Sequence, residues 1–214
     1  MTSHEKEVEK NFEDNPEKMT GERLYIPTLK YFWQSSPLAT DKKSSIPLFL
    51  RGIKVFDNFS DWELKKFSHF LHERVFTDDE IVIEEGDSGF GFYLIFSGNI
   101  EILIRRSMIV SGSVDSCQVL IARLTKGEYF GELALLEKQN KRNATAVCKG
   151  PTTLLAIYKP DIEELIERFP IIGAKFLQAI SLIVAYRFNS VTTELRALKE
   201  KISDLEKALE NTEV

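Results

Sequence analysis

The stretch at residues 130–147 constrains the fold and chemistry of this chain more than any other. Gly131 permits a backbone turn that a Cβ would obstruct, and an acid, Glu132, follows at once. The apolar run 133–136 is one helical turn long, so its free N–H groups point back toward Glu132 and suit an anion. A polar loop follows, and the guanidinium of Arg142 can then fold back over the helix start and the Glu132 side chain. The stretch predicts a site for a ligand with one negative charge and a nearby hydroxyl pair, such as a cyclic phosphate on a ribose.

Short β-type segments flank this stretch on both sides. Residues 92–96 predict a strand that ends in a turn at 97–99, and residues 105–118 predict a long hairpin connection. The other predicted strands are 81–83, 100–104, 119–124, 144–147 and 153–158. Short strands at this spacing are typical of a sandwich or roll, so we expect a mainly β fold with flanking helices.

A helix is predicted before the strands, because Ser60 and Glu63 form a capping box and apolar side chains then repeat at helical spacing. The repeating residues are Leu64, Phe67, Phe70 and Leu71. His69 and His72 share the predicted helix at i, i+3. They are either two surface histidines or part of a metal site, and no third ligand lies nearby in the sequence. We therefore predict no metal.

A long helix is predicted from Ile171 to about Leu209, and its last part has the heptad pattern of a coiled coil. Position a holds Phe188, Leu195, Ile202 and Leu209, and position d holds Val184, Val191, Leu198 and Leu205. Two g–e pairs, Glu194 with Lys199 and Lys201 with Glu206, have complementary charges for a parallel pairing. The pattern predicts a parallel homodimer, and the alternative is an amphipathic helix that folds on its own domain.

The chain divides into three expected parts. Residues 1–45 form an N-terminal extension, and its first 23 residues or so are charged and polar enough to be flexible. The aromatic residues in 24–45 are expected to pack on the domain or on a partner chain. Residues 46–170 form the β domain, and residues 171–214 form the long helix with its coiled coil.

Composition excludes several classes of protein. The net charge of −5 and the pI near 5.4 argue against a nucleic-acid surface. The charged N-terminus has no apolar signal region, and no apolar run is long enough to predict a membrane span. Cys117 and Cys148 are too few for a disulfide scaffold, so we expect reduced thiols in a cytoplasmic protein.

The stretch 130–147 resembles the phosphate-binding cassette of cyclic-nucleotide-binding domains, found in bacterial catabolite activator proteins, kinase regulatory subunits and gated channels. A second marker of that family is a Gly-Asp turn, here Gly86-Asp87, followed by an aromatic-rich strand and a Ser-Gly pair at 97–98. The resemblance covers roughly residues 46–190. It implies a jelly-roll-like β-roll followed by a long C-terminal dimerisation helix.

The resemblance also implies which residues bind the ligand. Glu132 would accept the ribose 2′-hydroxyl, and Arg142 would pair with the cyclic phosphate. The full predicted phosphate and ribose set is Gly131, Glu132, Leu133, Ala134, Arg142, Asn143 and Ala144. Ile102, Ile121 and Leu124 match positions that wall the sugar and base. Arg187 matches the position that contacts the base edge, although a solvated arginine beside the partner helix is an equal alternative.

Two classes of function remain open from the sequence. The first is a stand-alone sensor dimer that binds cyclic AMP or cyclic GMP and signals to an unidentified protein partner, since the long helix is not followed by a helix-turn-helix. The second is a dimeric adaptor with an idle or re-purposed pocket. Catalytic motifs are missing from the sequence, so we predict neither an enzyme nor a cofactor. In the kinases that this stretch resembles, a Thr at the position of Asn143 often accompanies cyclic GMP preference, so the resemblance favours cyclic AMP.

Overall fold

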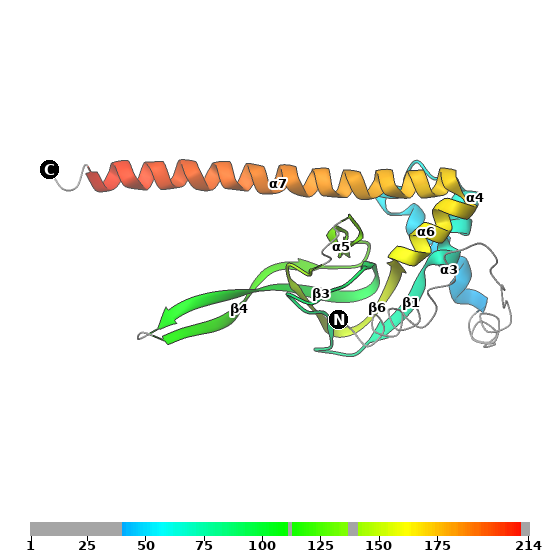
Figure 1. The fold of residues 1–214 in the computed structure, drawn as a ribbon, viewed down its shortest axis with the longest axis horizontal. Coiled ribbons are helices and arrows are strands. Elements are labelled where there is room, and N and C mark those ends of the chain that lie inside the picture. The colour runs from blue at the N-terminus through cyan, green and yellow to red at the C-terminus, as the bar shows by residue number, and fades with distance from the viewer. Residues whose placement is uncertain (1–39, 111–112, 137–140, 211–214) are drawn as a thin grey trace.

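The computed structural model describes residues 40–110, 113–136 and 141–210 as a β-roll with helices at one side (Figure 1). Its helical elements are α3 (Thr40–Arg51), η2 (Lys54–Phe56), α4 (Asp61–Phe67), η3 (Ser68–Phe70), α5 (Leu133–Leu136), α6 (Lys159–Arg168) and α7 (Pro170–Glu210). Its strands are β1 (His72–Phe76), β2 (Ile81–Ile83), β3 (Gly91–Val110), β4 (Ser113–Leu124), β5 (Tyr129–Phe130) and β6 (Thr145–Tyr158). The expected mainly β roll with a long C-terminal helix is confirmed.

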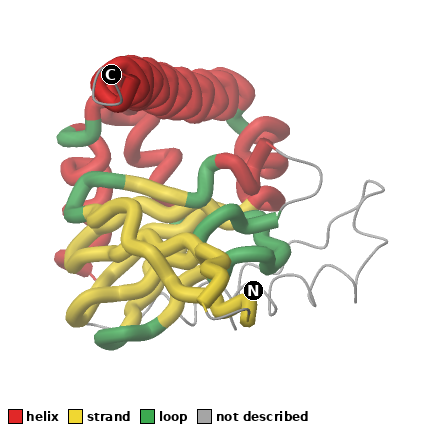
Figure 2. Tube along the Cα trace, turned by 90° about the vertical axis from the view of Figure 1, so that its left-hand side faces the viewer, coloured by secondary structure: helices red, strands yellow, loops and turns green. Residues whose placement is uncertain are grey.

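The strands form one antiparallel sheet in the order β1-β6-β3-β4. The short strand β2 adds to β6, and β5 adds to β3, so the sheet curls at those points. Viewed along α7, the strands lie together on one side of the molecule and the helix lies across the opposite side (Figure 2). The site residues of the cassette lie between β5 and β6, on the edge of the roll that faces α7 (Figure 1).

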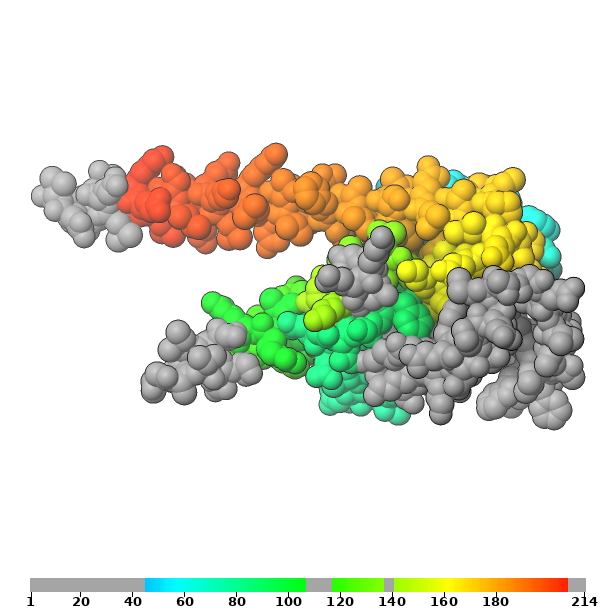
Figure 3. All heavy atoms as spheres, in the orientation of Figure 1, coloured from blue at the N-terminus to red at the C-terminus, as the bar shows by residue number. Residues whose placement is uncertain are grey.

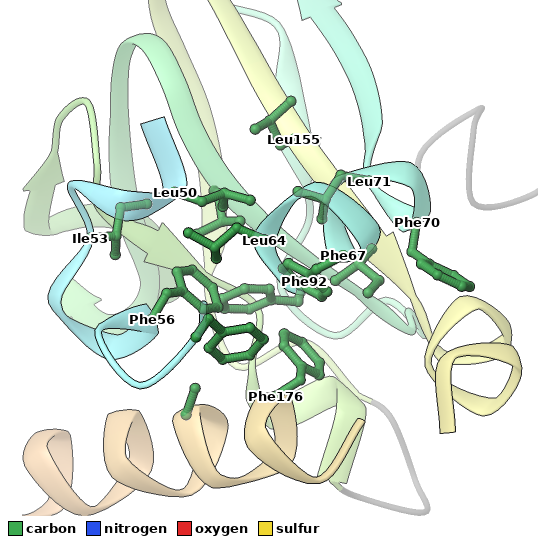
Figure 4. Close-up of a cluster of buried hydrophobic side chains, with 14 of the residues drawn as sticks. Leu50, Ile53, Phe56, Leu64, Phe67, Phe70, Leu71, Phe92, Leu155 and Phe176 are labelled. Atoms are coloured by element: carbon green, nitrogen blue, oxygen red, sulfur yellow. The ribbon is translucent and has the colours of Figure 1, made fainter. Parts of the chain in front are cut away.

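The start of β3 is buried on both faces, because the sheet separates two apolar clusters. Phe92 and Leu94 point toward the helices, whereas Tyr93 and Ile95 point into the roll. Figure 4 shows the helix-side cluster, in which Phe92 lies near Phe176 of α7. The four residues that were predicted to repeat on the first helix, Leu64, Phe67, Phe70 and Leu71, belong to this cluster. The helix-side cluster therefore fixes the position of α7 against the sheet.

Charged contacts hold the first half of α7 to the N-terminal helices. Lys175 Nζ lies 2.8 and 2.7 Å from the two carboxylate oxygens of Glu63, which is the predicted capping-box acid of α4. The capping box is confirmed: Glu63 N donates to Ser60 Oγ and Ser60 N donates to the Glu63 carboxylate. Gly173 lets α7 approach α6, because a Cβ there would lie 2.7 Å from the side chain of Ile166. The second half of α7 projects beyond the roll, with open space between it and the β3–β4 hairpin (Figure 3).

Three predicted strand boundaries are wrong, because glycines allow strands to continue where turns were expected. Residues 97–99 form an irregular register in β3, with Gly98 at φ +94°, and the strand continues to Val110. The stretch 105–118 is therefore a ladder between β3 and β4, not a long connection. The strands predicted at 144–147 and 153–158 are one strand, β6, which passes through Gly150 at φ +78°. Each glycine supplies a left-handed backbone without breaking the sheet.

The two histidines lie on different elements from those predicted. His69 is in η3 and His72 opens β1, so they do not share one helix. His72 Nε2 lies 3.0 Å from both carboxylate oxygens of Asp161, which gives this ring a protein partner. Within the described residues, no group of three or more His, Cys, Asp and Glu side chains is arranged to hold a metal ion.

Both ends of the predicted domain differ slightly from the elements observed. Helix α3 begins at Thr40, before the expected domain start at residue 46, and its Ile46 and Leu50 are buried in the core. Helix α7 begins at Pro170 itself, because a proline is tolerated in the first turn of a helix. The predictions for the extension up to residue 39 lie outside the described residues.

In the described part of the chain, α7 is the one helix that is long and apolar enough to cross a membrane by length and composition. A third (33%) of its most apolar window is buried in the protein. Core helices of globular proteins pass the same test. The buried residues Ile172, Phe176, Ile180 and Ile183 give this apolar composition a role in the core.

Candidate functional site

The cassette begins with a sharp turn that only glycine can make. Gly131 follows β5 with φ +84°, and a Cβ on it would lie 2.7 Å from the carbonyl oxygen of Gly91. The short helix predicted at 133–136 is present as α5, and Leu135 N donates to Glu132 O at 3.1 Å. The turn thus lays the start of the cassette against the first residue of β3.

Glu132 is buried to 2% exposure, and its two carboxylate oxygens differ. Oε1 accepts a hydrogen bond of 2.7 Å from Arg187 Nη1. Oε2 is buried and has no hydrogen-bond partner among the residues that the structure describes. A buried carboxylate oxygen without a donor is costly, so Oε2 is the acceptor that a ligand hydroxyl would satisfy.

Arg142 is also buried, at 5% exposure, and the Gly-Asp turn holds its backbone. Arg142 N donates to Asp87 O at 2.8 Å, and Gly86 N donates to Arg142 O at 2.7 Å. The two sequence markers therefore meet in the structure, because the turn at residues 86–87 holds the backbone of the loop that carries the arginine. The marker at residues 86–87 is therefore part of the site, although it is far from the cassette in the sequence.

Main-chain carbonyls and an aromatic ring surround the guanidinium of Arg142. Its Nη1 and Nη2 each donate to Gly91 O at 3.1 Å, and Nη1 lies 3.5 Å from Gly131 O. The guanidinium carbon lies 5.9 Å from the ring centroid of Tyr93. A Cβ at Gly89 would lie 2.5 Å from Arg142 Nε, so the glycine leaves room for the side chain. The arginine is thus a buried cation at the mouth of the roll, beside the turn that carries Glu132.

Arg187 reaches the cassette from α7. Besides its bond to Glu132, its Nη2 donates to Tyr129 O at 2.7 Å, and its guanidinium carbon lies 5.8 Å from the Tyr129 ring centroid. Burial raises the pKa of the Tyr129 hydroxyl above its ordinary value, partly offset by the charge of Arg187. The sequence placed Arg187 at the base edge, and its contact with Glu132 was missed. The two residues are 55 positions apart, and no local pattern links them.

The other predicted site residues occupy different environments. Leu133 and Ala144 are half-buried, Ala134 is buried and Asn143 is exposed on the cassette. Ile102 and Leu124 pack against the cluster inside the roll. Ile121, in contrast, is 53% exposed beside the register shift between β3 and β4. Glu132 and Arg142 are therefore the buried charged residues in the described part of the cassette. Of the three predicted wall residues, Ile102 and Leu124 pack against the cluster inside the roll and Ile121 does not.

A cavity of about 530 Å³ lies beside the cassette, between the η2 region, the end of β4 and α7. It is lined by Gly52, Ile53, Lys54, Val55, Leu124, Lys126, Gly127, Glu128, Tyr129, Ile183, Tyr186 and Arg187. Arg187 thus lines this cavity and also bonds to Glu132.

Comparison with known proteins agrees with this geometry. The family model described as the cyclic nucleotide-binding domain matches residues 73–169. The cAMP-dependent protein kinase regulatory subunit of Schizosaccharomyces pombe is 32% identical over 117 residues, which cover 55% of this chain and 26% of that protein. The chain therefore spans about a quarter of the length of this curated relative.

Two solved structures share the fold. A cyclic nucleotide-binding domain from Methylobacillus flagellatus superposes with a TM-score of 0.58 at 22% identity, over 71% of this chain and 81% of that one. The catabolite activator protein of Thermus thermophilus superposes with a TM-score of 0.55 at 26% identity, over 68% of this chain and 62% of that one. The resemblance stated from the sequence is thus confirmed: residues 73–169 match the cyclic nucleotide-binding domain family, and the chain is similar in sequence to a kinase regulatory subunit.

Proposed function

We propose that this protein is a cyclic nucleotide sensor, with cyclic AMP as its preferred ligand, that acts as a cytoplasmic dimer and signals to a protein partner. One observation carries the proposal: within the segment that matches the family, the buried carboxylate of Glu132 has an oxygen without a hydrogen-bond partner among the described residues, and the buried guanidinium of Arg142 lies against the preceding residue, Gly131. An acceptor for a hydroxyl and a cation for an anion are the two groups that a ribose cyclic phosphate requires.

The contacts of Arg142 support the phosphate assignment. Its two terminal nitrogens donate to the neutral carbonyl of Gly91 in the described structure. A phosphate oxygen is a stronger acceptor than a carbonyl, because both partners are then charged. The phosphate would therefore compete well for these donors, and the buried position would keep water away from the contact.

Arg142→Ala tests the phosphate assignment directly. We expect cyclic AMP binding to weaken by roughly 3–5 kcal/mol, because the substitution removes one partner of a buried charge pair between protein and ligand. Titration of a fluorescent cyclic AMP analogue measures the affinity. Arg123→Ala is the matched control, since Arg123 is an exposed arginine that bonds to Glu101 across the β3–β4 ladder. An affinity unchanged by Arg142→Ala would refute the phosphate assignment.

The second half of α7 supports the dimer. Its apolar side chains at the predicted a and d positions, Phe188, Val191, Leu195, Leu198, Ile202 and Leu205, are between 51% and 70% exposed. An apolar stripe of this length is stable in water when a second helix covers it. Charged residues alternate with the stripe, including the complementary pair Glu194 and Lys199, which favours a second copy over a lipid bilayer or a nucleic acid as the covering surface.

Calorimetric titration with cyclic AMP and cyclic GMP separates the sensor from the adaptor. The sensor is expected to bind at least one of them with measurable heat, and cyclic AMP more tightly, since Asn143 occupies the position after the arginine. No binding of either nucleotide would favour the dimeric adaptor whose pocket is idle or takes another ligand.

A further inference from the structure

Arg187 occupies a position that none of the predicted binding roles describes. It lies on α7, yet its terminal nitrogens bond to the cassette and to the strand before it, Nη1 to Glu132 Oε1 and Nη2 to Tyr129 O of β5, each at 2.7 Å. Its side chain is 43% exposed, whereas the Glu132 side chain is 3% exposed. The arginine side chain therefore lies between solvent and the buried carboxylate of Glu132.

These two bonds fix the orientation of the Glu132 carboxylate. A guanidinium is a planar fork, so donation to two separate acceptors determines where each nitrogen lies. Oε1 is held on the side of α7, and Oε2 is left buried without a donor among the described residues. One carboxylate oxygen therefore bonds to α7, and the other is left for a ligand. Without Arg187, both oxygens would be unpaired in a buried site, and the carboxylate would turn toward water.

We propose that Arg187 is a positioning residue for the ribose: it holds Glu132 so that Oε2 accepts the ribose hydroxyl, and it links this contact to the docking of α7. The inference rests on the proposed function. Since ligand and helix share one carboxylate, each stabilises the geometry that the other needs. Hydroxyl binding and helix docking are therefore coupled reciprocally.

This role differs from a contact with the base in what it predicts. A donor on the purine edge changes the ratio of affinities for cyclic AMP and cyclic GMP. A residue that positions Glu132 changes instead the ratio of affinities for cyclic AMP and its 2′-deoxy analogue. A residue that only stabilises the fold changes neither ratio.

The experiment is calorimetric titration of the full chain with cyclic AMP, 2′-deoxy cyclic AMP and cyclic GMP. The wild type should prefer cyclic AMP over the 2′-deoxy analogue by about ten- to a hundredfold, the value of a hydrogen bond to a charged group. In Arg187→Ala this preference should fall to about threefold or less, with the purine ratio unchanged. Arg196→Ala is the matched control, because Arg196 is an exposed arginine on the same helix.

Arg187→Lys tests the geometry more finely. One ammonium can bond to Glu132 but cannot reproduce the fork that also reaches Tyr129 O. The ribose preference should therefore return in part. An Arg187→Ala protein that keeps the full ribose preference would overturn the inference, and so would a change in the purine ratio alone.

The role of Arg187 in docking α7 can also be tested without ligand. Amide hydrogen exchange at residues 184–190 should be faster in Arg187→Ala than in the wild type and in Arg196→Ala. Equal exchange in all three proteins would overturn the link. Failure of the wild type to bind any cyclic nucleotide would refute the proposed function, whereas binding with an unchanged ribose ratio would refute the role of Arg187.

Discussion

The two halves of α7 are one continuous helix with two different environments. Residues 170–187 pack against the roll through Phe176, Ile180 and Ile183, and they end at the contact between Arg187 and Glu132. Residues 188–207 project from the roll (Figure 3), and their apolar side chains at the a and d positions are exposed. Both halves have apolar side chains at helical spacing, so that spacing by itself does not say what each half contacts.

The difference shows that apolar residues at helical spacing predict a buried helix face, but do not identify the surface that covers that face. In the first half, the partners are the aromatic rings of the same chain, including Phe67 and Phe92. In the second half, the strict 3.5-residue repeat with complementary g–e charges is typical of a partner helix. Three predictions test this assignment of one half to the fold and the other to assembly.

Phe176→Ala should give the largest loss of stability. Phe176 is completely buried, and its removal leaves a cavity between α7 and β3 that should cost about 3–5 kcal/mol of unfolding free energy. Urea denaturation followed by circular dichroism measures this loss, which should not depend on protein concentration. The control is Leu182→Ala, an exposed leucine on the same half of the helix. A loss below about 1 kcal/mol for Phe176→Ala would contradict intramolecular packing of this half.

Leu198→Asp combined with Leu205→Asp should break the assembly and leave the fold intact. Two charges per helix at the d positions would have to be buried in the seam, so the dimer dissociation constant should rise by roughly a hundredfold or more. Sedimentation velocity reports the mass, and circular dichroism reports the retained fold. Arg196→Asp with Ser203→Asp adds the same charges at b positions and should leave the mass unchanged. An equal mass for the d-position variant and the wild type would place the dimer seam elsewhere.

Lys175→Met should have a smaller effect that depends on pH. The bond from Lys175, with a further bond from the Ser60 N–H, lowers the pKa of the Glu63 carboxyl below its ordinary value of 4.5. A lowered folded pKa gives stability that is present above pH 4.5 or so and is lost as the pH falls through the folded pKa. We expect the variant to lose about 1–2 kcal/mol near neutral pH, since Lys175 is partly exposed.

Urea denaturation at several pH values measures this effect. The difference between wild type and Lys175→Met should shrink as the pH falls from the ordinary pKa of Glu63 toward its lowered pKa in the folded wild type, because the carboxyl that Lys175 stabilises becomes protonated over that range. Lys149→Met is the control, since Lys149 also pairs with an acid but at an exposed position. A difference that stays constant down to acid pH would exclude the charge pair as its source.

Local patterns predicted the parts of the fold that depend on neighbouring residues. The capping box at Ser60, the turn at Gly131 and the short helix at 133–136 were all found where their spacing placed them. The continuation of β3 through Gly98 was missed, because a glycine with positive φ is compatible with both a turn and an irregular strand.

The candidate site could be predicted only in part for the same reason. The positions of Glu132 and Arg142 relative to the turn follow from one continuous stretch of sequence. The contact between Glu132 and Arg187 depends on how α7 packs against the roll, which involves many distant side chains. The exposure of Ile121 depends on a register shift that its own apolar character does not reveal.

Two polar contacts of α7, made in addition to its apolar packing, lie at different distances from the free end of the helix. Lys175 holds it to α4 near one end, and Arg187 holds it to the cassette twelve residues further on, at a distance of about 18 Å along the axis. Residue 210 lies about 52 Å from Lys175 along the same axis. With Lys175 as the pivot, a shift of about 1 Å at Arg187 becomes one of about 3 Å at the far end. A small rearrangement of one carboxylate is thus magnified about threefold where a second chain would be held.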